Sequence, residues 1–282
     1  MKDDRQGAGP NPGGGSAGAG APSFDQSSRL LSFVRRAVDD YEMIAPGDRI
    51  MVGLSGGKDS AALLAAMIEL KRFYPIPFDV CACTVDMGFA GGDTSYMADF
   101  CRAYGVEFRC VSTNIAHVVF DVKKEKNPCS LCARMRRGAL HGAAQEMGAN
   151  KLALGHHFDD VVDTFMLALL HEGRIGTLSP VTYLDRRKLT MIRPLIYIPE
   201  KDVRYFVRRN PGLPIRPSLC PEDKHTERET VKKMLDDLDR ADKGLKHRIF
   251  GAIQKAGVDG FREAGTGKRK YDQDQATEGD QT

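Results

Sequence analysis

One short run of the sequence constrains the fold more than any other. The apolar residues 50–54 predict a buried strand, and the polar run Ser-Gly-Gly-Lys-Asp-Ser follows at residues 55–60. A stretch rich in Ala, Leu and Met then predicts a helix. A glycine turn between a strand and a helix favours phosphate, because backbone N–H groups approach the anion and the helix dipole attracts negative charge. We therefore expect this run to bind phosphate.

The 55–60 run is not a Walker A loop. That motif has four residues between two glycines, then Lys and Ser or Thr, but a count from Gly53 reaches Lys58 instead of a glycine. Ser-Gly-Gly-x-Asp-Ser resembles the pyrophosphate loop of the PP-loop ATPases. The resemblance implies cleavage of ATP between its α- and β-phosphates, with adenylation of a carbonyl-type oxygen. A glycine-rich turn without a ligand is the alternative interpretation.

Strand and helix patterns alternate along the chain. Further apolar strands are predicted at residues 78–85, 106–111, 151–154 and 189–192. Helical patterns lie at residues 97–104, 130–147, 161–169 and 200–209. This order predicts an α/β fold, a doubly wound and mostly parallel sheet of about five strands with helices at both ends of the chain. Ligands of such sheets bind beyond the carboxyl ends of the strands, where the 55–60 run lies.

Composition divides the chain into four parts. Residues 1–23 are mostly Gly, Ala, Pro and Ser, so we expect a disordered tail that cannot bury enough apolar surface to offset its ordering entropy. Residues 24–198 predict a nucleotide-binding domain with an inserted Cys-x-x-Cys loop, and residues 199–264 a C-terminal helical region. The polar residues 265–282 predict a second disordered tail. Apolar runs are too short for a membrane span or a signal peptide, so we expect a cytoplasmic protein.

Three of the seven cysteines lie in proline-flanked segments. Cys129 and Cys132 form a Cys-x-x-Cys pair that can share one metal, and Cys220 is the natural third partner. Three cysteines without an obvious fourth suit a cubane iron–sulfur cluster with one open iron. A structural zinc completed by Asp223 or His225 is the alternative. The remaining four lie in apolar patterns and are expected to be buried small hydrophobes: Cys81, Cys83, Cys101 and Cys110.

Four motifs occur in a fixed order along the chain. They are the 55–60 run, Pro-Cys-Ser-Leu-Cys-Ala-Arg-Met-Arg-Arg-Gly at 128–138, Gly-His-His-Phe-Asp-Asp at 155–160 and Arg-Pro-Leu at 193–195. Together they resemble the tRNA 2-thiocytidine synthetases, a branch of the PP-loop tRNA thiolases with a Rossmann-like fold, from about residue 30 to residue 237. Bacterial members of this branch often have a cysteine where this chain has Pro217, whereas Cys220 matches their second late cysteine.

This resemblance implies an activity and its requirements. The O2 atom of an anticodon-loop cytidine, position 32 in tRNA numbering, would be adenylated and replaced by sulfur. ATP, Mg²⁺ and a [4Fe-4S] cluster held by Cys129, Cys132 and Cys220 would be needed. The implied partners are tRNA and a cysteine desulfurase or other sulfide or persulfide donor, with no membrane and with a homodimer as the assembly.

Candidate site residues follow from the motifs and their chemistry. The residues predicted to bind ATP are Ser55, Gly56, Gly57, Lys58, Asp59, Ser60, Asp86, Arg136, Gly155 and His156. Catalytic roles are predicted for Asp59, Cys129, Cys132, Asp159 and Asp160, the carboxylates as Mg²⁺ ligands or as helix caps. Guanidinium groups match phosphate geometry, so RNA contacts are predicted for Arg134, Arg137, Arg186, Arg187 and Arg208, with a solvated basic face as the alternative.

The route of the sulfur stays open at the level of sequence. Either cluster-bound sulfide attacks C2 of the activated base, or Cys129 or Cys132 carries a persulfide that the other cysteine resolves. Cys220 is dispensable only in the second case. Two other classes of protein also remain: another PP-loop ligase with a structural zinc, and a non-catalytic module that binds nucleotide and metal.

Overall fold

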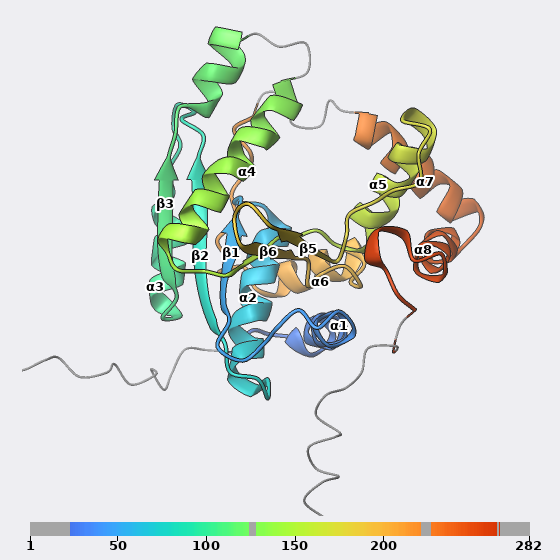
Figure 1. Ribbon diagram of the computed structural model, residues 1–282, viewed down its shortest axis with the longest axis horizontal. Helices are drawn as coiled ribbons and strands as arrows, with labels where there is room; N and C mark the ends of the chain where they lie inside the picture. The colour runs from blue at the N-terminus through green and yellow to red at the C-terminus, as the bar shows by residue number, and fades with distance from the viewer. Residues whose placement is uncertain (1–22, 124–127, 221–226, 264, 266–282) are drawn as a thin grey trace, which may run out of the picture.

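The computed structural model describes residues 23–123, 128–220, 227–263 and 265. Apart from Ser23 and Gly265, the two tails predicted to be disordered lie outside these residues. The described chain forms one sheet with helices on both of its faces (Figure 1). Within this part of the chain, no helix is long and apolar enough to cross a membrane.

The sheet has six strands in the order β3-β2-β1-β4-β6-β5. Their bounds are β1 Arg49–Leu54, β2 Asp79–Asp86, β3 Glu107–Ser112, β4 Lys151–Ala153, β5 Val181–Leu184 and β6 Leu189–Ile192. All neighbours pair parallel except β5 and β6, which are antiparallel. The mostly parallel, doubly wound sheet is confirmed, but the predicted count of about five is one strand short. The missed strand is β5, a short edge strand without a fully buried side chain, so it has no apolar run to identify it.

Helix α4 packs on one face of the sheet, whereas α1, α2 and α6 pack on the other. The bounds of the helices are α1 Ser27–Asp40, α2 Lys58–Phe73, α3 Ser95–Ala103, α4 Pro128–Glu146, α5 Phe158–His171, α6 Glu200–Arg209, α7 Glu227–Ala241 and α8 Leu245–Lys255, with a π-helix at His117–Lys123 and a 3₁₀ turn at Val258–Gly260. Strand side chains alternate between faces. Met51 and Cys81 therefore pack with α4, whereas Val52 and Ala82 pack in the core formed with α1, α2 and α6.

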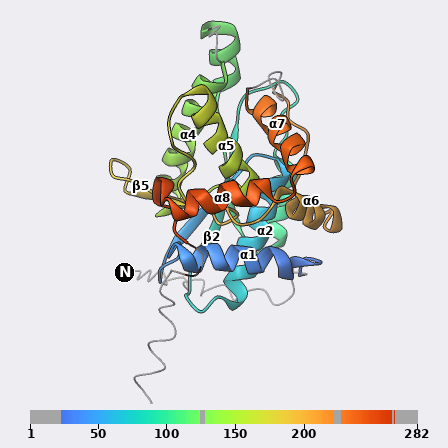
Figure 2. The same cartoon turned by 90° about the vertical axis from the view of Figure 1, so that its right-hand side faces the viewer.

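The C-terminal helices do not pack on the sheet as α4 and α2 do. Helices α7 and α8 pack against α5, and α8 crosses α5 in Figure 2. Helix α6 instead packs against α1 and α2. The start of α5 and the start of α2 lie at the carboxyl ends of β4 and β1, so the C-terminal helices reach the same end of the sheet as the 55–60 run.

Candidate functional site

The 55–60 run forms a tight loop between β1 and α2. Gly56 has a φ of +79°, which favours glycine, and a Cβ atom there would lie 2.9 Å from the Tyr96 hydroxyl. Ser60 Oγ accepts from the Ser55 N–H at 3.1 Å and donates to the Gly57 carbonyl at 3.0 Å. Gly57, which has no side chain to cap the helix, is the N-cap of α2. The loop therefore presents an N-terminus suited to an anion.

A cavity of about 270 Å³, called here the loop cavity, opens beside this turn at the carboxyl ends of β1 and β4. Its lining residues come from β1 and the 55–60 loop, β2, α4 and the start of α5: Gly53, Leu54, Ser55, Asp59, Ser60, Val85, Arg136, Leu140, Leu154, Gly155, His156 and Asp160. Gly155 comes so close to α2 that a Cβ atom would lie 2.9 Å from the Ser60 nitrogen. Most of the residues predicted to bind ATP thus meet in one space.

A second cavity of about 370 Å³, called here the cysteine cavity, adjoins the loop cavity. Ser55, Val85 and Arg136 line both cavities. The cysteine cavity is also lined by Gly56 and Asp86, which were predicted to bind ATP, and by Cys132 and Cys220. Asp86 accepts a hydrogen bond from the Gly88 N–H at 2.9 Å, so one of its oxygens also shapes the turn after β2.

Of the three candidate cluster ligands, Cys132 and Cys220 line the cysteine cavity, and Cys129 lies close enough to Cys132 to affect its pKa. Cys129 is exposed, whereas Cys132 and Cys220 are half-buried. Burial raises the pKa of the Cys132 thiol, Arg136 opposes that shift, and the nearby thiols of Cys220 and Cys129 raise the pKa further. Within the described residues, no three Cys, His, Asp or Glu side chains already stand at metal-binding distances. The suggested zinc ligands Asp223 and His225 lie outside these residues.

The other cysteines differ from these three. Cys81, Cys83 and Cys101 are fully buried, and burial raises the pKa of their thiols to about 11, 12 and 12, respectively. They are inert small hydrophobes, as the sequence predicts. Cys110 is half-buried and accepts a hydrogen bond from the Thr94 hydroxyl at 3.5 Å.

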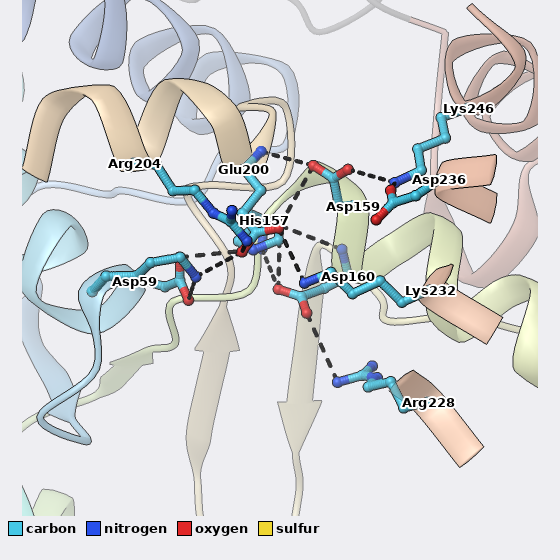
Figure 3. Close-up of polar contacts among 11 residues, drawn as sticks. Asp59, His157, Asp159, Asp160, Glu200, Arg204, Arg228, Lys232, Asp236 and Lys246 are labelled. Atoms are coloured by element: carbon cyan, nitrogen blue, oxygen red, sulfur yellow. Dashed lines mark hydrogen bonds and ion pairs between the residues drawn. The ribbon is translucent and has the colours of Figure 1, made fainter. Parts of the chain in front are cut away.

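Two carboxylates face the loop cavity in a way that suits a divalent cation. The buried Oδ1 atom of Asp59 has no hydrogen-bond partner among the described residues, and it lies 3.7 Å from His157 Nε2. Asp160 forms a capping box with His157 at the start of α5, in which its Oδ2 accepts from the His157 N–H at 2.9 Å (Figure 3). An unpartnered carboxylate oxygen beside a second carboxylate fits Mg²⁺, which prefers oxygen ligands.

Asp159, the neighbour of Asp160, faces elsewhere. Its Oδ2 accepts the Glu200 N–H at 2.7 Å, and its Oδ1 lies 3.1 Å from Lys246 Nζ (Figure 3). It lines a separate cavity of about 270 Å³ between the starts of α5 and α6 and helix α8. Both oxygens of Asp159 thus join α5 to α6 and α8.

Lys58 is held in a similar way. Its Nζ lies 2.9 Å from both Asp59 Oδ2 and Glu200 Oε1. Lys58 is not among the described residues that line the loop cavity or the cysteine cavity. Burial alone would raise the pKa of Glu200, but hydrogen bonds from Lys58, Arg204 and Lys232 hold it well below its usual range. This carboxylate therefore ties the 55–60 loop to α6 and α7.

Comparison with known proteins agrees with this geometry. A family model described as a PP-loop domain matches residues 28–213. A tRNA-cytidine(32) 2-sulfurtransferase of Aeromonas salmonicida is 40% identical over 236 residues, 82% of this chain and 78% of that protein. A protein of the same name from Teredinibacter turnerae is 38% identical over 229 residues, 80% of this chain and 76% of that protein.

The chain belongs to the PP-loop family, in the tRNA-cytidine(32) 2-sulfurtransferase branch. Among solved structures, the U34-tRNA thiolase NcsA from Methanococcus maripaludis, determined with its [4Fe-4S] cluster, superposes with a TM-score of 0.66 at 25% identity. The match covers 80% of this chain and 78% of that one. The resemblance drawn from the four sequence motifs is thereby confirmed.

Arg193 of the Arg-Pro-Leu motif, to which the sequence assigned no role of its own, orients His156. Arg193 is buried, and its Nε donates to His156 Nδ1 at 3.3 Å. Burial, together with the Arg193 charge, lowers the pKa of His156 to about 4, so the imidazole is neutral at pH 7. Because Nδ1 accepts, the proton lies on Nε2, and His156 offers an N–H donor at the loop cavity. The Arg-Pro-Leu motif at 193–195 was the only sequence signal for this role.

The arginines predicted to bind RNA fall into two places. Arg134 and Arg137 are exposed on α4, and Arg186 and Arg187 are exposed in the turn between β5 and β6. Arg187 donates to Gln145 of α4 at 3.4 Å, and Arg137 and Arg187 both contribute to a lowered pKa of the buried His141, after burial itself. Arg208 lies on α6, across the sheet from α4, and is not brought together with the others.

Proposed function

We propose that this chain is an ATP-dependent, iron–sulfur-dependent tRNA-cytidine 2-sulfurtransferase. The O2 atom of cytidine 32 attacks the α-phosphorus of ATP, and pyrophosphate leaves. Sulfur then adds at C2, and AMP departs with the former O2 atom. The printed names of the curated relatives and the [4Fe-4S] cluster of the solved thiolase support this activity.

One observation carries the proposal. The cysteine cavity is lined at one end by Ser55 and Gly56 of the pyrophosphate loop and elsewhere by Cys132 and Cys220. Exchange of oxygen for sulfur requires that the activated base and the sulfur meet in one enclosed space. Arg136, which lines both cavities, stands between the place for ATP and the place for the base. A guanidinium there can hold the α-phosphate as the base attacks it.

The ATP site is assigned from the geometry of the loop cavity. The hydroxyls of Ser55 and Ser60, which line this cavity, are proposed to receive the pyrophosphate together with the N-terminus of α2 and the adjacent Gly56 and Gly57. Asp59 and Asp160 are the proposed Mg²⁺ ligands, because they face this cavity and Asp59 Oδ1 is unpartnered among the described residues.

The remaining members of the predicted nucleotide set have distinct positions. His156 is proposed to donate its Nε2–H to the nucleotide, and Gly155 permits the close approach of α2. Asp86 faces the cysteine cavity, on the side of the base. Lys58 and Asp159 are assigned to the ion pairs that hold the loop and α5 to the C-terminal helices.

The cluster is assigned to Cys129, Cys132 and Cys220. The donor set fits, because the thiols of Cys129 and Cys220 both lie close enough to Cys132 to raise its pKa, and soft thiolates are the ligands that iron–sulfur clusters use. When bound, a [4Fe-4S] cluster with three protein ligands has an open iron that can carry the sulfur. The chain itself shapes the cavity, orients ATP and holds the base. A persulfide on Cys129 or Cys132 is the competing route, and it predicts a dispensable Cys220.

The partners belong to the same proposal. Arg134, Arg137, Arg186 and Arg187 are exposed around α4 and are proposed to contact tRNA phosphates. A cysteine desulfurase or another sulfide or persulfide donor supplies the sulfur, and the assembly is a homodimer, as the family resemblance implies. Because the proposed substrate is tRNA, the proposed location is the cytoplasm.

Nucleoside analysis of tRNA tests the activity. Anaerobically purified protein is incubated with ATP, Mg²⁺, sulfide and a tRNA transcript that has cytidine 32, with a uridine 32 transcript as the matched control. We expect 2-thiocytidine and one AMP per thiolated cytidine in the first case only. AMP formation without thiolated nucleoside would indicate another PP-loop ligase, and thiolation of both transcripts would contradict the specificity for position 32.

A further inference from the structure

The third cysteine lies on a segment without regular secondary structure. Residues 214–220 form neither helix nor strand, and Leu219 of this segment is exposed. The Cys220 N–H donates to the Ser218 hydroxyl at 3.2 Å, a bond within the segment itself. The position of Cys220 therefore depends on where the start of the segment is anchored.

Pro214, which is buried, and Ile215, which packs against the core, fix the start of the segment, and Arg216 adds a hydrogen bond through its backbone. Its N–H donates to the carbonyl of Gly56 at 3.0 Å, so the segment is hydrogen-bonded directly to the pyrophosphate loop. Cys220 follows four residues later, and four residues span at most about 14 Å when fully extended. The bond to Gly56 thus confines the thiol of Cys220 to the neighbourhood of the loop.

The side chain of Arg216 contacts two residues at the start of α3, next to the pyrophosphate loop. Its guanidinium lies over the ring of Tyr96, 4.2 Å from the centroid, and its Nη1 atom lies 2.8 Å from Asp93 Oδ2. The hydroxyl of Tyr96 lies 2.9 Å from the position of a Cβ atom on Gly56. Asp93 in turn accepts the Ser95 N–H at the start of α3.

These contacts join three parts of the chain at one residue. Arg216 bridges the pyrophosphate loop, the start of α3 and the segment of Cys220, and all three line the cysteine cavity. The ion pair with Asp93 is about half exposed and by itself contributes little. What distinguishes Arg216 is that its backbone contacts the pyrophosphate loop at Gly56 while its side chain contacts Tyr96 and Asp93 at the start of α3.

We propose that Arg216 is a positioning residue that couples nucleotide binding at the pyrophosphate loop to cluster retention by Cys129, Cys132 and Cys220. This inference rests on the proposed function. A nucleotide that orders Gly56 also orders the Cys220 segment through Arg216. Because binding free energies are linked, a bound cluster strengthens nucleotide binding by the same factor.

Release of iron to a chelator tests the coupling. The holoprotein is purified anaerobically, and loss of the visible cluster absorbance is followed with and without Mg²⁺ and a non-hydrolysable ATP analogue. In the wild type we expect the analogue to slow iron loss about 5-fold or more, the usual lower range of such couplings. Arg216→Ala keeps the backbone N–H but removes the side-chain contacts with Tyr96 and Asp93 that hold this N–H at Gly56, so we expect the protection to fall below about 2-fold. Asp93→Asn, which removes only the ion pair, gives an intermediate value.

Controls separate coupling from general damage. Arg102→Ala removes an exposed arginine on α3 whose ion pair among the described residues is with Asp99 of the same helix, and it should keep the wild-type protection. Analogue affinity, measured by calorimetry, should differ between holoprotein and apoprotein in the wild type but not in Arg216→Ala. Equal protection in wild type and Arg216→Ala, or none in the wild type, overturns the coupling. A wild type purified without iron overturns the proposed cluster instead.

Discussion

A buried lysine connects the C-terminal helices to the start of α5. Lys246 on α8 is 6% exposed, and its Nζ lies 3.1 Å from Asp159 and 2.5 Å from Asp236 of α7. Burial lowers the pKa of Lys246, but the pairs with Asp236 and Asp159 outweigh it, and the net pKa is raised. The ion pairs therefore stabilise the charged lysine by more than its desolvation costs.

Replacement of this lysine by methionine keeps the length of the side chain and removes the charge. The side chain of Asp159 is 13% exposed, and among the described residues it would retain the Glu200 N–H as a hydrogen-bond donor, with His157 Nδ1 3.9 Å away. Removal of one partner from a buried ion pair typically costs 3–5 kcal/mol. We expect Lys246→Met to lower the free energy of unfolding by about 3 kcal/mol, or the Tm by about 9 °C for a chain of this size.

Asp236→Asn is the matched control, because it breaks the other pair of the same lysine. The side chain of Asp236 is 46% exposed, so its pair is screened by water, and the expected loss is about 0.5 kcal/mol. Urea unfolding followed by circular dichroism measures both variants. The reasoning is refuted if Lys246→Met lies within about 1 kcal/mol of the wild type, or if the two variants lose the same amount.

Three other experiments give clear expectations. Burial raises the pKa of Asp163 to about 7, above its unfolded value near 3.8, so the fold loses stability as pH rises from about 4 to about 7. Asp163→Asn should therefore stabilise the protein by about 2–3 kcal/mol more at pH 8 than at pH 5 in thermal unfolding, and equal gains at both values would contradict this. Gly155→Ala places a methyl group against Asp59 and Ser60, and we expect at least about 10-fold weaker binding of an ATP analogue in calorimetry; unchanged affinity would argue against the tight approach. Lys58→Met and Glu200→Gln remove the same ion pair, so a double-mutant cycle of unfolding free energies should show a coupling above about 0.5 kcal/mol, whereas strict additivity would exclude it.

The parts of the fold with strong local signals were predictable from the sequence. Residues 50–54 are apolar and end in a glycine turn, and they form β1 and the loop before α2. The β5 strand has no such signal, because its side chains are only partly buried and its stability comes from pairing with β6. Short edge strands of this kind depend on tertiary partners that the local sequence does not reveal.

The residues of the site also divide into those with a local sequence signal and those whose positions depend on distant partners. Adjacent residues on a helix point about 100° apart, so Asp159 and Asp160 can face different surroundings, and the sequence does not say which of them faces the loop cavity. The choice is made by Lys246, 87 positions later, and by the Glu200 N–H, which hold Asp159 toward α8 and α6. Lys58 is similarly held by Glu200. Arg216 could not be found either, because its partners Gly56, Tyr96 and Asp93 are more than a hundred positions away.

The most direct test of the central claim is metal analysis of anaerobically purified protein in three forms: wild type, Cys220→Ala and Cys110→Ser. Cys110 is the matched control, because it is a half-buried cysteine on β3 that is not among the residues lining the cysteine cavity. We predict about four irons and four sulfides per chain in the wild type and in Cys110→Ser, and loss of both in Cys220→Ala. One zinc per chain without iron, or full iron content in Cys220→Ala, would contradict a cluster held by Cys129, Cys132 and Cys220.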